Sequence, residues 1–199
     1  MNLLLDTCVF IDYLGRKEPF FSAAAQVIAA GFFGDARLWL PVQSLTDAFY
    51  VLRKYIPADK LQSMLKTVCA HISLVDLCAQ DSLRALSLGW SDIEDCQVAL
   101  AAEKTKADYL ITRDVKDFSR SLVPPMSPED WLQMMRDTQG LSYEMVDWEL
   151  AELRLRGARA VLPAAGACPP LGFVRCLPAV YVPRALRNVK NSRSDAKSC

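Results

Sequence analysis

Short apolar runs alternate with longer segments of helical spacing through the first two thirds of the chain. Strands buried on both faces of a parallel sheet read as continuous apolar runs of this kind. We therefore expect strands at residues 3–5, 37–40, 72–75 and 109–111.

Between these runs, apolar residues recur at positions that place them on one side of a helix. One helix is expected directly after Asp6, and further helices are expected at residues 20–33, 45–52, 57–68, 80–88, 92–106 and 128–135. Strands that alternate with helices of this length predict an α/β fold. We expect a three-layer α/β/α sandwich around a mainly parallel sheet.

Charge and composition change late in the chain. Residues 1–150 carry 14 Lys and Arg against 21 Asp and Glu, a formal charge of −7, whereas residues 151–199 carry 9 against 2, a charge of +7. Residues 157–183 also hold five prolines and three glycines. We expect a folded domain at 1–137, a candidate helical extension at 138–156, and a poorly structured basic tail at 157–199.

Neither end of the chain favours a membrane protein. The first residues lack the basic segment of a secretory signal, and the apolar stretch at 160–182 is interrupted by prolines and by Arg175. Seven cysteines, an odd number without a Cys-x-x-Cys pair, favour reduced thiols over disulfides or zinc. We expect a cytoplasmic protein without a membrane partner.

Acidic residues lie at the ends of the predicted elements. Asp6 follows the first strand and Asp114 follows the fourth, and the carboxyl ends of parallel strands meet at one edge of a sheet. Asp47 lies near the start of the helix after the second strand. Asp92 and Asp95 begin the helix at 92–106, and their i, i+3 spacing puts them on one face. We expect these acids to converge.

Carboxylates that converge in one pocket repel one another, and a hard divalent cation that prefers oxygen ligands relieves this repulsion. The expected ion is Mg²⁺ or Mn²⁺. Such a site polarises a phosphodiester, activates a water and stabilises charge on the leaving oxygen. The acids therefore predict a metal-dependent nuclease.

Taken singly, each acid also has a simpler explanation. Asp92 is best explained as the N-cap of its helix, and Asp114 with Asp117 can form an Asx turn. Asp12 and Glu94 are expected to be solvated. Four acids in this order, each at the end of an element, are less probable as independent caps than as one site.

Three segments carry a resemblance to a known family: Leu-Leu-Leu-Asp-Thr-Cys-Val-Phe-Ile-Asp at 3–12, Asp-Ile-Glu-Asp-Cys-Gln-Val-Ala-Leu-Ala-Ala at 92–102, and Leu-Ile-Thr-Arg-Asp-Val-Lys-Asp-Phe at 110–118. They resemble the motifs of the PIN-domain nucleases, particularly the VapC-type toxins of bacterial toxin–antitoxin pairs. The resemblance covers residues 1 to about 137.

The resemblance implies roles for the acids. Asp6 and Asp95 would be the principal metal ligands, and Asp114 would be the acid that completes the catalytic site. Asp47 stands where the family usually shows a glutamate, so its reach is shorter by one methylene. Its role stays open between contact through a water and contact with a shifted metal. Asp92 would support the site from the cap of its helix.

Hydroxyl and cationic side chains accompany the acids. Thr7 and Thr112 match small hydroxyl positions of the family, where they could hold a carboxylate or a water. Because the domain has a charge of −7, contact with RNA phosphates must come from the metal and local cations. The candidate RNA-binding residues are Arg113, Arg16 and Lys17.

The main hypothesis is a Mg²⁺- or Mn²⁺-dependent endoribonuclease, the toxin of a toxin–antitoxin pair. The resemblance implies an RNA substrate, a cognate antitoxin and a homodimer. Two alternatives stay open. A catalytically silent PIN-fold binding module is motivated by Asp47, and a DNA-processing nuclease is compatible because the acids do not distinguish the two backbones.

Overall fold

The computed structural model describes residues 1–143, which form a parallel five-stranded sheet of order β3-β2-β1-β4-β5. The strands are β1 (Asn2–Leu5), β2 (Arg37–Pro41), β3 (Ser73–Val75), β4 (Tyr109–Ile111) and β5 (Pro125–Met126). The four predicted strands are confirmed. The edge strand β5 was not predicted, because two residues next to a proline give no apolar run.

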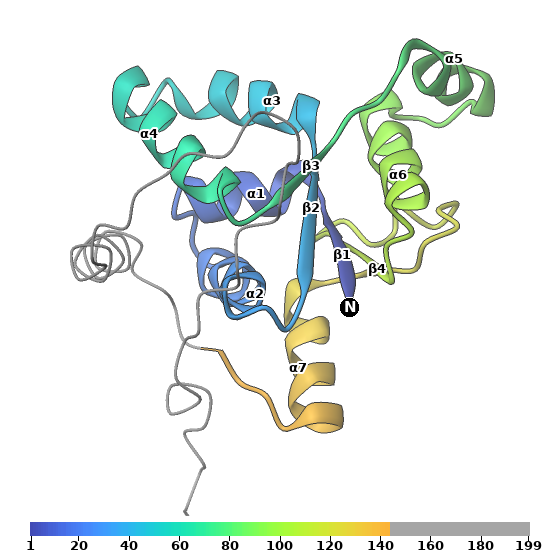
Figure 1. Cartoon of the computed structure of the whole chain (residues 1–199). Coiled ribbons are helices and arrows are strands. Elements are labelled where there is room, and N and C mark those ends of the chain that lie inside the picture. Colours follow the sequence, from blue (N-terminus) through green and yellow to red (C-terminus); the bar gives the residue numbers. More distant parts are fainter. Residues whose placement is uncertain (144–199) are drawn as a thin grey trace, which may run out of the picture. The chain divides into compact units, whose positions relative to one another are not determined.

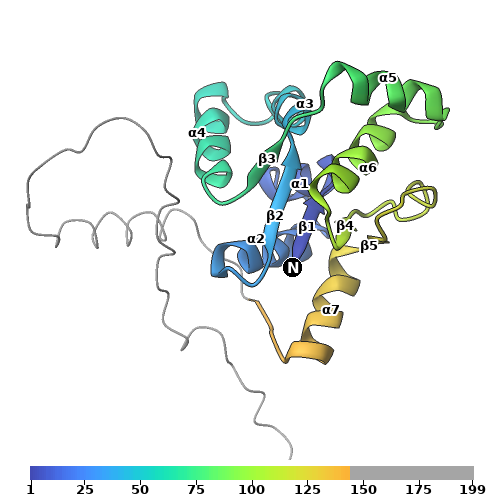
Figure 2. The same ribbon diagram turned by 45° about the vertical axis from the view of Figure 1, so that its right-hand side comes forward.

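Within the described residues, seven helices surround the sheet. They are α1 (Thr7–Leu14), α2 (Phe21–Phe33), α3 (Val42–Leu52), α4 (Ala58–Cys69), α5 (Ala79–Leu88), α6 (Ile93–Thr105) and α7 (Pro128–Gln139). Figures 1 and 2 show α1 and α2 on one face and α6 on the other. The helix α5 packs on α6, and α7 packs on α2. The predicted three-layer α/β/α sandwich is confirmed.

Burial on both faces explains the apolar strand β1. Leu3, Leu4 and Leu5 are fully buried. Leu4 packs with Leu110 of β4 against the helix α6, whose small residues allow close approach; the α6 residues in this cluster are Val98, Ala99, Ala101 and Ala102. The helix and the two central strands therefore form one rigid unit that fixes the start of α6 relative to the end of β1.

The strand order reverses at β1. The chain passes from β1 to β2 and β3 on one side, and then returns through α5 and α6 to β4 on the other side of β1. Crevices at such switch points, beyond the carboxyl ends of the strands, are the usual ligand sites of open parallel sheets. The Asp6 N–H donates to the Ile111 carbonyl at 3.0 Å, so the ends of β1 and β4 are held side by side.

The packed part of the chain reaches at least residue 143. Tyr143 is buried, and its ring stacks on that of Trp131 with centroids 6.1 Å apart. Residues 1–143 all belong to one compact unit. Most of the predicted helical extension, and the whole predicted basic tail, lie outside the described residues. Among residues 1–143, no helix combines the length and apolar character needed to cross a membrane.

Gly31 allows α2 to approach β2 closely. A Cβ at this position would overlap the buried side chain of Leu38. We expect Gly31→Ala to lower the free energy of unfolding by about 1 to 2 kcal/mol, because overpacking exceeds the gain in helix propensity. Urea unfolding followed by circular dichroism measures this cost. Leu38→Ala removes the overlapping atoms, so the double variant should lose less than the sum of the two single variants; additive losses would contradict the close approach.

Candidate active site

Asp6 is the most buried acid at the carboxyl end of β1, with 5% of its surface exposed. It is the N-cap residue of α1, yet its side chain makes no capping hydrogen bond. Instead its Oδ2 accepts hydrogen bonds from Thr112 Oγ1 at 2.7 Å and from Cys8 Sγ at 2.9 Å. Burial raises the pKa of Asp6, and these hydrogen bonds oppose the rise. The side chain is thus held in place by its neighbours.

Cys8 serves as a hydrogen-bond donor beside Asp6. Burial, followed by the charge of Asp6, raises the pKa of the Cys8 thiol to about 12. The thiol therefore stays protonated at neutral pH and keeps its hydrogen for the carboxylate.

Two threonine hydroxyls connect the elements around Asp6. Thr112, fully buried, donates to Asp6 while its oxygen accepts from the Asp114 N–H at 3.0 Å. Thr7 Oγ1 lies 2.8 Å from Ser44 Oγ of α3, and the Thr7 hydroxyl also hydrogen-bonds the Glu94 carboxylate of α6. A hydroxyl has only one hydrogen to donate. Because the Thr7 hydroxyl donates its hydrogen to the Glu94 carboxylate, its oxygen accepts the hydrogen bond from the Ser44 hydroxyl. The hydroxyls thus link α1, α3, α6 and the loop after β4.

The first turn of α6 brings three acids to the same place. Asp92 is the N-cap, and its Oδ1 accepts from the Glu94 N–H at 2.7 Å, as expected for a cap. Asp95 is the third residue of the helix and lies in the same first turn. Burial raises the pKa of Asp95 to about 6, with further contributions from the charges of Asp92, Asp6, Glu94 and Asp117. Asp6 and Asp95 are therefore close enough to repel each other.

Glu94 is not solvated, contrary to the expectation from the sequence. It is half-buried, and its pKa is raised by burial and then by the charges of Asp6, Asp47 and Asp92. Nothing in the sequence indicated this burial, because Glu94 is a polar residue at the start of a helix whose first residue, Ile93, is itself 44% exposed. Glu94 therefore joins the predicted acids. Asp47 of α3 lies near enough to Glu94 for its charge to raise the pKa of Glu94.

The loop after β4 carries two exposed acids. Asp114 acts on the pKa of Asp12, whereas Asp117 acts on that of Asp95. The Asp117 N–H donates to the backbone carbonyl of Asp114 at 2.9 Å, so the turn is closed by the main chain. Phe118, fully buried against Trp90, anchors the end of this loop. Asp117 is a further acid that the sequence interpretation had assigned only to a turn.

Asp12 is the second residue whose expected exposure was wrong. It is 1% exposed, and its Oδ2 lies 3.0 Å from Arg113 Nε in an ion pair without hydrogen-bond alignment. The Arg113 guanidinium also lies 4.4 Å from the centroid of the Phe20 ring. Burial raises the pKa of Asp12, while the charges of Arg113 and Lys17 lower it. Arg113 is therefore committed to Asp12 rather than free for a phosphate.

The other two predicted cations are exposed after α1. Arg16 has a positive φ of 49° and lies over the ring of Phe21 at 5.7 Å. The Lys17 N–H donates to the backbone carbonyl of Asp12 at 2.9 Å. The structure thus places both cations beside the Asp12 and Arg113 pair.

The chemistry of the clustered donors fits a hard divalent cation. Burial raises the pKa values of Asp6, Glu94 and Asp95, and the charge of Asp6 raises those of Glu94 and Asp95 further, so a cation beside them would lower the cost of their ionisation. Within residues 1–143, no group of three or more His, Cys, Asp and Glu side chains is arranged to hold a metal ion. Mg²⁺ commonly uses only one or two carboxylates and completes its shell with water and substrate phosphate.

Comparison with protein families identifies this region. A sequence model of the PIN domain matches residues 2–116, more than half of the chain. The match includes Asp6, Asp47, Asp95 and Asp114. The comparison with curated proteins gives no match.

Similar solved structures include VapBC2 from Rickettsia felis bound to a promoter DNA fragment, with 14% identity, a TM-score of 0.49, and coverage of 64% of this chain and 98% of that chain. For VapBC-1 from nontypeable Haemophilus influenzae the values are 18%, 0.49, 65% and 99%. For a toxin–antitoxin complex from Klebsiella pneumoniae they are 18%, 0.48, 63% and 97%.

The Asp12 and Arg113 pair generates a prediction about stability. Arg113→Gln leaves a buried carboxylate without its cation, so the free energy of unfolding at pH 8 should fall by about 2 to 4 kcal/mol. Without Arg113 the folded-state pKa of Asp12 rises further above its unfolded value. The carboxyl then takes up a proton on acidification, and the deficit relative to the parent should shrink at pH 5.

Urea titrations of both proteins at the two pH values measure this difference. Arg113→Gln combined with Asp12→Asn is the matched control, because it removes both charges and should largely lose the pH dependence of the deficit. A deficit of equal size at pH 5 and pH 8 in Arg113→Gln would contradict the pairing.

Proposed function

Since the match over residues 2–116 shows that the chain belongs to the PIN-domain family, we propose on that premise that it is a metal-dependent endoribonuclease. The observation that carries the proposal is the crowding of Asp6, Glu94 and Asp95 at the switch point of the sheet. Burial raises the pKa of all three, and the charge of Asp6 adds to the rise for Glu94 and Asp95. PIN-domain nucleases use divalent metal ions, and this donor set suits Mg²⁺ or Mn²⁺.

Each side chain has a distinct task in the proposed site. Asp6 and Asp95 hold the cation, and Asp114 completes its surroundings from the loop after β4. Thr112 and Cys8 fix the Asp6 carboxylate through Oδ2. A ligand whose partners already hold it in place loses little freedom when the cation binds, which favours binding.

The proposed reaction is hydrolysis of a phosphodiester. When bound, the cation supplies an activated water and stabilises the charge on the leaving oxygen. A bond forms between the water oxygen and phosphorus, and the bond from phosphorus to the 3′ oxygen breaks. The products are a 5′-phosphate and a 3′-hydroxyl, as the resemblance to the family implies. Glu94 within the acid cluster, and Asp47 beside it, can accept the proton that the attacking water loses, and the leaving 3′ oxygen takes up a proton from solvent.

The resemblance of the three motifs supports a narrower proposal, a VapC-type toxin that acts on RNA in the cytoplasm. Its partners would be a cognate antitoxin and a second copy of the chain. Arg16 and Lys17 are the exposed cations proposed to meet RNA phosphates near Asp12. Arg113 would contribute from within its ion pair, as part of the local positive charge.

The activity of acid variants tests this proposal. Asp6→Asn and Asp95→Asn keep the shape of the side chain but remove a negative charge from the cation's ligands. Each should lower single-turnover cleavage of RNA in Mn²⁺ by about a hundredfold or more. The double variant should be little worse than either single variant, because the two acids act as a unit. Labelled RNA and DNA are assayed side by side.

Two matched controls change an acid without touching the proposed ligands. Asp92→Ala removes the helix cap and should mainly cost about 1 kcal/mol of stability. Asp137→Asn alters an exposed carboxylate on α7 that bonds Gln133, and should keep parental activity. Near-parental cleavage by folded Asp6→Asn or Asp95→Asn would favour the binding-module alternative, and equal cleavage of DNA would favour a DNA-processing nuclease.

A further inference from the structure

Exposed aromatic and cationic side chains gather where α3 ends. Tyr50 is 58% exposed and Tyr55 is 81% exposed. The Arg53 guanidinium lies 4.9 Å from the centroid of the Tyr50 ring, and Lys54 Nζ lies 5.7 Å from it. We call Tyr50, Arg53, Lys54 and Tyr55 the aromatic–basic ridge. Both tyrosine rings are largely exposed and contribute little buried surface to the fold. Exposed rings beside two cations are typical of a ligand-binding surface.

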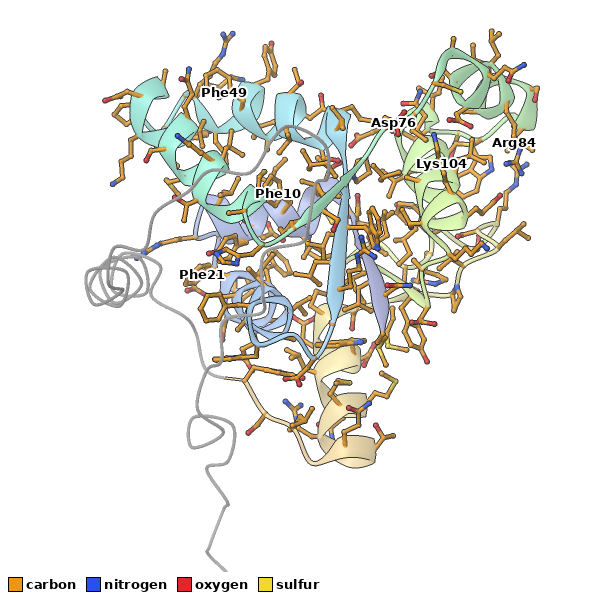
Figure 3. The ribbon with its side chains drawn as sticks, viewed as in Figure 1. Phe10, Phe21, Phe49, Asp76, Arg84 and Lys104 are labelled. Atoms are coloured by element: carbon orange, nitrogen blue, oxygen red, sulfur yellow. The ribbon has the colours of Figure 1, made fainter. Side chains whose placement is uncertain are left out.

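The ridge carries positive charge on a domain whose net charge is negative. Several other cations are neutralised: Arg84 pairs with Glu103, Lys104 pairs with Asp81, and Arg113 pairs with Asp12. In the part of the chain that the structure describes, Arg53 and Lys54 make no ion pair. Figure 3 shows Phe49, the neighbour of Tyr50, on the opposite side of the domain from Arg84 and Lys104.

The helix α4 adds positive charge next to the ridge. It packs on α3 and carries Lys60 and Lys66 against a single acid, Asp59. With Arg53 and Lys54 of the connecting turn included, residues 42–69 carry four cations against two acids, Asp47 and Asp59. The partner that suits such a surface is an anion with flat apolar groups.

Helical geometry connects the ridge to the acid cluster. Asp47 and Tyr50 are three residues apart on α3, so these two lie along one stripe of the helix, and Lys54 follows in the turn after the helix ends at Leu52. Tyr50 is about 4.5 Å further along the helix axis than Asp47, at 1.5 Å per residue. At the other end of the stripe, Gln43 bonds Gln97 of α6 at 3.4 Å. Tyr50 therefore lies on the same side of α3 as Asp47, whose charge raises the pKa of Glu94 in the acid cluster.

We propose that the aromatic–basic ridge binds the single-stranded part of an RNA substrate next to the scissile phosphate. Bases stack on Tyr50 and Tyr55, and phosphates contact Arg53 and Lys54. Stacking on aromatic rings combined with a basic track is how proteins hold single strands without reading their sequence. The excess of cations over acids in residues 42–69 favours a polyanion as the occupant. This inference rests on the proposed ribonuclease function, whose substrate it specifies.

Binding is measured separately from cleavage. Fluorescence anisotropy with a labelled single-stranded RNA, in EDTA and with the full chain, gives the dissociation constant without turnover. Replacing both tyrosines, Tyr50→Ala with Tyr55→Ala, should weaken binding about tenfold or more. Tyr50→Phe with Tyr55→Phe keeps the rings and should stay within about twofold of the parent, since stacking needs the ring and not the hydroxyl.

The cations have their own control. Arg53→Gln with Lys54→Gln should weaken binding and flatten its dependence on salt, because fewer counterions are released. Arg37→Gln is the matched control: Arg37 also lies over an aromatic ring, that of Trp39 at 4.3 Å, but on β2 and away from the ridge. It should leave the affinity unchanged. Circular dichroism checks that every variant is folded, which the exposure of these side chains favours.

Failure of this inference is distinguishable from failure of the proposed function. Ridge variants that bind RNA weakly but still cleave it at saturating concentration support both. Unchanged RNA affinity in the Tyr→Ala pair overturns the ridge as an RNA site, even if the parent cleaves RNA. If that pair also shifts a dimer to a monomer in sedimentation, the ridge is a contact between copies of the chain instead.

Discussion

Repulsion among carboxylates at the carboxyl end of β1 is the constraint on which the rest of the site depends. Asp6 is buried there, and Asp95 and Glu94 are held against it by the start of α6. A fold that places like charges together loses stability unless something of opposite charge joins them. Because α6 packs on β1 and β4, the acids cannot separate without disturbing the core.

Two kinds of neighbouring group leave the negative charge of these carboxylates in place. Neutral donors, the Thr112 hydroxyl and the Cys8 thiol, orient Asp6 without cancelling its charge. The nearby cation Arg113 is bound to its own acid, Asp12, and so leaves the cluster negative. Among residues 1–143, none of the ion pairs involves Asp6, Glu94 or Asp95, and we propose that a divalent cation neutralises them. Arg53 and Lys54 follow the end of α3 and make no ion pair within residues 1–143. We propose that a polyanion held at the acids passes over them.

The pattern of hydrophobic residues predicted four strands and the helices between them, because the spacing and length of apolar runs depend on local sequence. It also placed Asp6 and Asp114 at one edge, because topology brings the carboxyl ends of parallel strands together. The pattern failed for Asp12 and Glu94. Both are polar residues of helices and were assigned to solvent, but distant segments cover them: Arg113 pairs with Asp12, and Thr7 bonds Glu94. Contacts between distant segments of this kind leave no periodic signal.

The central claim, that the fold holds a repulsive acid cluster which a divalent cation relieves, is tested most directly by one comparison of stability. The free energy of unfolding of the parent and of Asp95→Asn is measured at pH 7, in EDTA and in millimolar Mn²⁺. The account predicts that the order reverses: Asp95→Asn is the more stable protein in EDTA, because a repelling charge is gone, and the parent is the more stable in Mn²⁺, because it binds the ion more tightly. The same order under both conditions would contradict it.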